Sequence, residues 1–218
     1  MHHMGEKAGT HRHFLPAAGR DLFLPLYDPL TRLLGGDRAR QRLIDQAELA
    51  PGHEALDVGC GTGTLILQIR TSIPSVITAG LDPDPKALAR ARRKVEREGA
   101  TVRFDQGFAD ALPYLDASFD RVFSSMMFHH VETADKEKML REARRVLRPG
   151  GSLHLMDFAG AEASDGLLAR LLHTHARLKD NTERRILEWM RQAGFADPVK
   201  VCSGRLIFGR LAYYRAGR

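Results

Sequence analysis

The chain has 218 residues, of which 43% are hydrophobic and 28% charged, so it has the composition of a folded globular protein and the length of one domain with an appendage. Its 33 lysines and arginines outnumber 27 acidic residues, and the net charge of +6 permits an anionic partner without identifying one. Two distant cysteines exclude a disulfide framework and fit a reducing cytoplasm, and no apolar stretch reaches the roughly eighteen residues of a membrane helix.

The first 50 residues predict a helical cap ahead of the main domain, which we expect to span residues 51–218. Residues 1–13 are polar and rich in histidine and glycine, and we expect them to be disordered. From Phe14 to Ala50, apolar side chains recur at helical spacing, interrupted by Pro25 and Pro29.

From residue 54 onward, short apolar strands alternate with amphipathic helices. The expected strands are residues 54–58, 76–81, 101–105, 120–124 and 152–157. The expected helices are residues 62–70, 85–98 and 133–147, the last of which is ended by a proline and two glycines. This alternation predicts an α/β fold with a mostly parallel sheet and helices on both faces.

The C-terminal part of the chain predicts a long amphipathic helical segment and a closing hairpin. Residues 163–193 carry leucines at helical spacing, and we expect a helical lid inserted there. Residues 199–202 and 205–214 are typical of two strands, with Ser203 and Gly204 at the turn between them. The hairpin is expected to close one edge of the sheet.

The densest functional signal follows the first predicted strand, where Asp57 leads into Gly59, Gly61 and Gly63. Glycines at such a turn allow close backbone approach to a ligand, and the next helix offers free N–H groups to an anionic group. A dinucleotide-binding loop would need a glycine in place of Thr64, and a P-loop would need a Gly-Lys-Ser/Thr run. Neither is present.

A second signal is Asp82, which ends the next predicted strand 25 residues after Asp57. The carboxyl ends of neighbouring parallel strands meet where such sheets bind ligands, and a carboxylate there can accept hydrogen bonds from ribose hydroxyls. The two signals together predict a nucleoside-containing ligand. In the purely structural alternative the glycines only make a tight turn and Asp82 only caps a helix.

Five motifs occur in order between Leu43 and Asp157: Asp57-Val58-Gly59-Cys60-Gly61-Thr62-Gly63, Asp82, Leu112-Pro113-Tyr114, Ser118-Phe119-Asp120 and Leu147-Arg148-Pro149-Gly150-Gly151. Together they resemble the class I S-adenosylmethionine-dependent methyltransferases, and the chain is most similar to the ubiquinone/menaquinone-biosynthesis type (methyltransferase type 11). The resemblance implies a Rossmann-like seven-stranded sheet with a C-terminal antiparallel strand. It also implies S-adenosyl-L-methionine as methyl donor and S-adenosyl-L-homocysteine as product.

The resemblance also assigns contacts to the methyl donor. Asp57 would orient the methionine amino group, Asp82 would hold the ribose hydroxyls, and Tyr27 either covers the donor or packs in the core. Position 108, usually an acid, is a phenylalanine. We expect Phe108 and the Ala109 N–H at the adenine, with Asp110 as the alternative acceptor. The full expected set is Tyr27, Asp57, Gly59, Cys60, Gly61, Gly63, Asp82, Pro83, Phe108, Ala109, Asp110 and Ser124.

Methyl transfer from a sulfonium is a direct displacement, so the protein mainly aligns the nucleophile and excludes water. His129 and His130 follow the fourth predicted strand and Asp157 ends the fifth, and each is a candidate general base for an acceptor that loses a proton. In the alternative reading the histidines only cap or pack a helix, as a histidine pair at a strand end often does. The close histidine pairs are His11/His13 and His173/His175, and the second pair would point to different sides of a helix. Because His129 and His130 also have no predicted carboxylate partner, we expect no metal site.

The leucines of the predicted cap and lid favour a small apolar or aromatic acceptor, such as a quinone or phenol. The alternatives are an RNA methyltransferase with the same methyl donor, a nicotinamide oxidoreductase and a non-catalytic nucleoside-binding regulator. Thr64 argues against nicotinamide, and the absence of basic residues interleaved with aromatic ones argues against RNA. We expect a monomer or homodimer in the cytoplasm, without membrane insertion.

Overall fold

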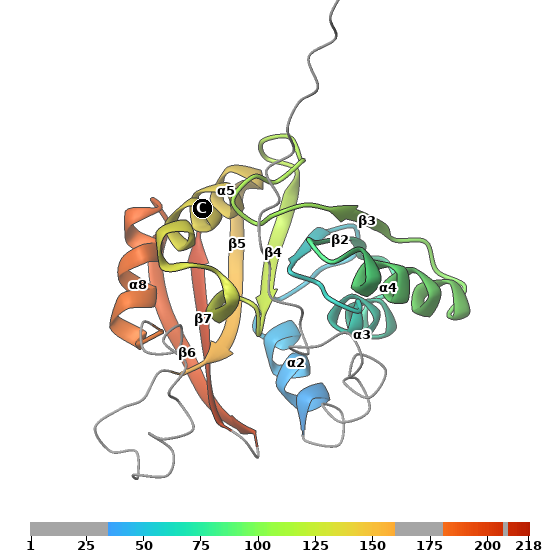
Figure 1. Ribbon diagram of the computed structural model, residues 1–218, viewed down its shortest axis with the longest axis horizontal. Coiled ribbons are helices and arrows are strands. Elements are labelled where there is room, and N and C mark those ends of the chain that lie inside the picture. Colours follow the sequence, from blue (N-terminus) through green and yellow to red (C-terminus); the bar gives the residue numbers. More distant parts are fainter. Residues whose placement is uncertain (1–34, 160–180, 207–208) are drawn as a thin grey trace, which may run out of the picture.

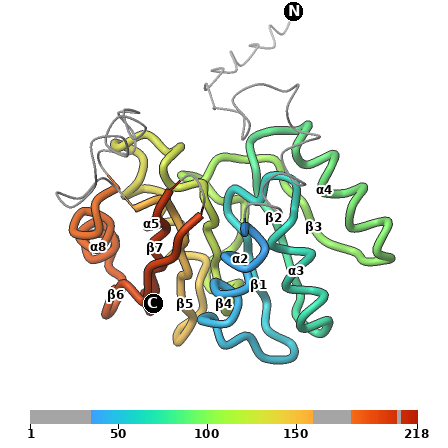
Figure 2. Tube along the Cα trace, turned by 90° about the horizontal axis from the view of Figure 1, so that it is seen from below, coloured from blue at the N-terminus to red at the C-terminus, as the bar shows by residue number. Residues whose placement is uncertain are grey.

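The computed structural model describes residues 35–159, 181–206 and 209–218, and its centre is a seven-stranded sheet in the order β3-β2-β1-β4-β5-β7-β6 (Figures 1 and 2). The first five strands are parallel, and β7 runs antiparallel to both of its neighbours. The strands are β1 (Glu54–Val58), β2 (Ile77–Asp82), β3 (Arg103–Gln106), β4 (Phe119–Ser125), β5 (Leu147–Phe158), β6 (Ala196–Leu206) and β7 (Gly209–Gly217). The predicted fold class is confirmed.

Helices cover both faces of this sheet. On one face, α5 (Thr133–Val146) and α8 (Glu183–Gln192) bury apolar side chains in the largest hydrophobic cluster. On the other face, α2 (Gly36–Asp45) and α3 (Thr64–Ser72) pack on the sheet, and α3 also packs on α4 (Pro85–Arg97). A short 3-10 helix, η2 (Phe128–His130), follows β4. The central strands are buried on both faces, which explains their nearly continuous apolar sequence.

The C-terminal hairpin forms, but its turn is not where the sequence predicted it. Ser203 and Gly204 lie inside β6, paired with Ala212 and Leu211 of β7. A Cβ atom at Gly204 would come within 3.1 Å of the Tyr213 ring, so this glycine accommodates a close approach between strands. The glycine signal was therefore a packing feature and not a turn.

The predicted cap and lid are described only in part. Of the cap, α2 packs on the sheet through Leu43 and Ile44. Of the residues predicted as a lid, α8 packs on α5 and the sheet through Ile186 and Met190. The remaining parts, residues 1–34 and 160–180, lie outside the described residues.

Candidate functional site

The predicted site residues gather at the carboxyl ends of the parallel strands. In the register of β1 and β2, Asp57 pairs with Gly80 and Val58 with Leu81, so the loop after β1 begins beside Asp82. The backbone N–H groups of Gly59 and Cys60 both donate to the Leu81 carbonyl, at 2.8 and 3.0 Å. The glycine loop is thus held against the end of β2.

Two glycines of this loop have distinct reasons to be glycine. All of Gly59, Gly61 and Gly63 have positive φ angles, of 75°, 52° and 74°. A Cβ atom at Gly59 would lie 2.2 Å from Cγ of Met127, so the loop and the segment after β4 approach closely there. A Cβ atom at Gly61 would meet nothing within 4 Å, so the backbone at Gly61 faces open space. A ligand can approach the main chain closely at that point.

Asp82 is fixed by backbone hydrogen bonds to both of its carboxylate oxygens. Oδ2 accepts from the Gly61 N–H at 2.8 Å and Oδ1 from the Asp84 N–H at 2.9 Å. Asp82 is 9% exposed, and this burial raises the pKa of its carboxyl, although the two N–H groups act in the opposite direction. Each oxygen keeps acceptor capacity, so the carboxylate can still accept from a pair of hydroxyl groups.

Asp57 is the most unusual group of the site. It is buried, and its Oδ1 has no hydrogen-bond partner among the residues that the structure describes. Burial, together with the neighbouring charge of Asp82, raises the pKa of Asp57 to about 7, and Arg40 opposes the rise. A buried acceptor without a donor costs stability and is expected where a ligand supplies the donor.

The residues predicted at the adenine follow β3. The N–H of Gly107 donates to the Asp82 carbonyl at 3.2 Å, which places this segment beside the predicted ribose contact. Phe108, Ala109 and Asp110 are each half-buried. Contact of Phe108 and Ala109 with the adenine, and the alternative role of Asp110, stay predictions.

The structure brings two of the three predicted catalytic residues together. His129 Nδ1 lies 2.6 Å from Oδ1 of Asp157, and the His129 backbone N–H donates to Oδ2 at 2.7 Å. Asp157 is fully buried, while the His129 side chain is 14% exposed. The expectation that His129 has no carboxylate partner was therefore wrong, because η2 turns its ring back toward the neighbouring β5. The His130 ring lies against the His129 ring at a tilt of 40°, with 4.0 Å between ring centroids.

Ser124 and Lys94 are two further polar residues near the candidate site. Ser124 lies on β4, is fully buried, and its Oγ has no hydrogen-bond partner in the described part of the chain. Lys94 of α4 was not predicted, yet its Nζ donates to the hydroxyls of Thr62 and Thr64, at 3.0 Å each. Nothing in the sequence marks this contact, which depends on the packing of α4 against the glycine loop.

Tyr27 and the histidine pairs His11/His13 and His173/His175 lie outside the described residues. Within the described ranges, no three histidine, cysteine or acidic side chains are grouped so that they could hold a metal ion. In the same ranges, no helix is long and apolar enough to cross a membrane.

Comparison with known proteins confirms the resemblance noted in the sequence. Residues 55–151 match a family model described as a methyltransferase domain. The chain is 45% identical over 138 residues to a demethylmenaquinone methyltransferase of Thermus thermophilus and 38% identical over 155 residues to one of Deinococcus radiodurans. These alignments cover 62% and 69% of this chain, and 61% and 64% of the relatives, so the chain spans less than two thirds of their length.

Among solved structures, the fold is similar to that of phosphoethanolamine N-methyltransferase 2 from Haemonchus contortus in complex with S-adenosyl-L-methionine. The TM-score is 0.77 at 15% sequence identity, and the match covers 93% of this chain and 58% of that chain. At this identity the similarity speaks for the fold alone.

Proposed function

We propose that this chain is an S-adenosylmethionine-dependent methyltransferase that acts on a small aromatic acceptor of the quinol or phenol type. The observation that carries the proposal is the buried, unpartnered Oδ1 of Asp57 beside the glycine loop and Asp82. A cationic amino group would supply the missing donor, and a charged hydrogen bond of this kind contributes about 1.5–3 kcal/mol.

The residues present fit the methyl donor at three points. Asp57 would accept from its ammonium group, the backbone around Gly61 would pass close to it, and Asp82 would accept from its two ribose hydroxyls. When bound, S-adenosylmethionine supplies an electrophilic methyl group on a positively charged sulfur. The chain's own residues then have to orient the acceptor and remove its proton.

His129 is the residue best placed to take that proton. A carboxylate can only accept hydrogen bonds, so the 2.6 Å contact places the proton of a neutral His129 on Nδ1, which donates to Oδ1 of Asp157. Nε2 then keeps its lone pair and can act as the base. Transfer to a quinol carbon forms a carbon–carbon bond, breaks the sulfur–methyl bond and releases the carbon's proton, which His129 would receive.

The acceptor class rests on two supports. The relatives from Thermus and Deinococcus are named demethylmenaquinone methyltransferases, and their acceptors are therefore quinone-derived. In this chain, the ring of Phe158 lies edge-on to His129 with 5.3 Å between centroids, and the His130 ring is a second ring neighbour of His129. Aromatic neighbours of this kind favour a planar apolar acceptor beside the base.

The experiment is a labelled-methyl assay with a panel of reduced naphthoquinones, benzoquinols, simple phenols and bulk RNA. We expect transfer to the quinols or phenols, and transfer only to RNA would contradict the acceptor class. His129→Ala should lower kcat by about 10²–10⁴-fold while leaving adenosylhomocysteine affinity unchanged. His53→Ala is the matched control, because His53 precedes β1 and caps the turn at Ala50. Unchanged turnover in His129→Ala would remove this residue from the mechanism.

A further inference from the structure

The connection from β3 to β4 is made by residues 107–118, which contain neither helix nor strand. Parallel strands are usually joined through a helix, whose backbone satisfies its own hydrogen bonds. The backbone N–H and C=O groups of this segment therefore need hydrogen-bond partners from other parts of the chain. It begins beside Asp82, where the Gly107 N–H donates to the Asp82 carbonyl, and it buries Leu112 and Tyr114 in the main hydrophobic cluster.

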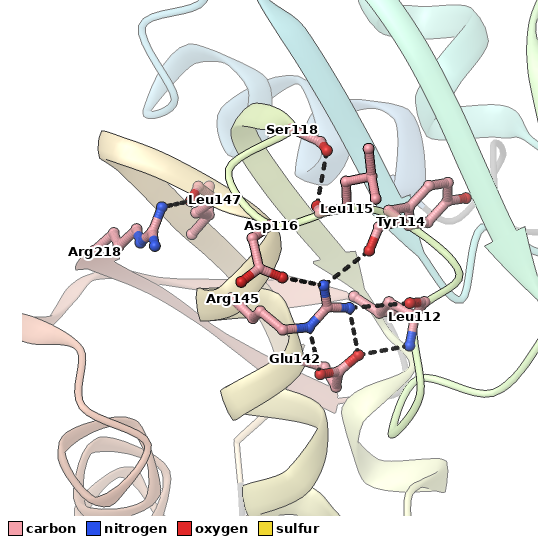
Figure 3. Close-up of polar contacts among 9 residues, drawn as sticks. All are labelled: Leu112, Tyr114, Leu115, Asp116, Ser118, Glu142, Arg145, Leu147 and Arg218. Atoms are coloured by element: carbon pink, nitrogen blue, oxygen red, sulfur yellow. Dashed lines mark hydrogen bonds and ion pairs between the residues drawn. The ribbon is translucent and has the colours of Figure 1, made fainter.

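Arg145, near the end of α5, donates hydrogen bonds to two backbone carbonyls of this segment (Figure 3). Its Nη2 donates to the Leu112 carbonyl at 3.0 Å, and its Nη1 donates to the Tyr114 carbonyl and to Oδ1 of Asp116, at 2.8 Å each. Nε and Nη2 form a two-pronged contact with Glu142, at 2.7 Å each. All five guanidinium N–H donors are thus in use, a pattern that the three donors of a lysine cannot reproduce.

Glu142 holds the part of this segment that lies next to the predicted adenine contacts. Its Oε2 accepts from the Leu112 N–H at 2.8 Å, and its contact with Arg145 holds the pKa of Glu142 below its usual range. One residue earlier, the Ala111 N–H donates to the Phe108 carbonyl at 3.2 Å and closes a turn over residues 108–111. That turn is therefore held between Asp82 at one end and Glu142 at the other.

We infer that Glu142 and Arg145 are a positioning pair that holds the turn at residues 108–111 in place for the adenine of the methyl donor. This inference rests on the proposed function, because it assumes that the donor's adenine lies against this turn. Neither residue touches reacting atoms. The pair therefore sets the affinity for the donor and leaves the rate of methyl transfer nearly unchanged.

Arg148 provides a matched control. It also bridges two acidic side chains, with Nη1 to Asp120 at 2.7 Å and Nη2 to Glu54 at 2.8 Å. Its side chain is 36% exposed against 30% for Arg145. Arg148 joins the beginnings of strands, and both of its acidic partners lie outside residues 107–118. Loss of either arginine should lower stability, but only loss of Arg145 should change the affinity for the donor.

The experiment compares wild type, Arg145→Met, Arg148→Met, Arg145→Lys and Glu142→Gln in the full chain. Calorimetry measures the Kd of adenosylhomocysteine, steady-state assays measure KM and kcat, and thermal unfolding measures Tm. We expect Arg145→Met to raise the Kd, and the KM for the donor, about tenfold, which is about 1.4 kcal/mol. The kcat and the KM for the acceptor should stay within about twofold of wild type. Arg148→Met should change only the Tm.

Glu142→Gln keeps one carbonyl acceptor and is the milder variant if Arg145→Met fails to fold. It should raise the Kd of adenosylhomocysteine severalfold. Arg145→Lys should recover only part of the affinity that Arg145→Met loses. If the arginine variants shared a lowered Tm and a wild-type Kd, the positioning role would be wrong and the proposed function untouched. If wild type itself did not bind adenosylhomocysteine, the proposed function would fall and the positioning role with it.

Discussion

Replacement of Asp57 by asparagine removes a buried charge while keeping the size of the side chain. Asp57 is 3% exposed, and its Oδ1 finds no donor in the described part of the chain. In the proposed complex this oxygen accepts from the donor's ammonium group, an interaction of about 1.5–3 kcal/mol. We therefore expect Asp57→Asn to bind adenosylhomocysteine about 10- to 100-fold more weakly than wild type.

The same replacement should stabilise the free protein. Burial first, and the Asp82 charge second, raise the pKa of Asp57 from 3.8 to about 7. Because the folded-state pKa is the higher one, the cost of ionising Asp57 is absent below pH 3.8, grows as the pH rises and is complete above about pH 7. A difference of about three units corresponds to about 4 kcal/mol. The asparagine variant has no such ionisation, so its free energy of unfolding should exceed that of wild type at neutral and alkaline pH.

Calorimetric titration gives the affinity, and urea unfolding at about pH 4 and about pH 8 gives the stability. Asp120→Asn is the control, because Asp120 accepts from the Glu54 N–H and pairs with Arg148 at the opposite end of the sheet. That variant should lose stability and keep its affinity. Wild-type affinity in Asp57→Asn would show that Asp57 does not bind the ammonium group, and a stability gain that did not grow with pH would show that its pKa is not raised in the folded state.

Three further predictions concern single side chains. Gly59→Ala should cost about 1–3 kcal/mol of stability in urea unfolding, because its Cβ would lie 2.2 Å from Met127 Cγ, and Met127→Ala should restore part of the loss. Asp82→Asn should weaken adenosylhomocysteine binding about tenfold or more in calorimetry, because an amide would turn a donor toward a backbone N–H. Burial lowers the pKa of His154 from 6.5 to about 3, so its contribution to stability is present above pH 6.5 and is lost as the pH falls toward 3. His154→Gln should therefore reduce the loss of unfolding free energy between pH 6.5 and 3. If this loss were the same as in wild type, His154 would not be its cause.

The fold and the donor side of the site could be predicted because they depend on short-range patterns. β1 spans Glu54–Val58 as predicted, since a strand buried on both faces reads as a continuous apolar run. Asp57, Asp82 and the glycines each end or follow such a strand. In a parallel sheet those ends lie at one edge, so their proximity follows from the alternation of elements alone.

The contacts that could not be predicted join residues through tertiary packing. His129 and Asp157 are 28 residues apart, and their contact depends on the turn at η2. Glu142 and Arg145 stand three residues apart, a spacing typical of an ordinary ion pair on a helix surface, and nothing in the sequence marks residues 107–118 as their partner. The predicted turn at Gly204 failed for a related reason, because glycine serves close packing as readily as it serves turns.

The most direct test is the transfer of a labelled methyl group from S-adenosylmethionine to a reduced, short-chain naphthoquinone by the wild-type chain. We expect a methylated quinol that requires the methyl donor, and much slower transfer by Asp57→Asn at donor concentrations below the wild-type KM. Absence of transfer to any quinol or phenol, by a protein that binds adenosylhomocysteine, would contradict the proposed acceptor. Absence of adenosylhomocysteine binding would contradict the account as a whole.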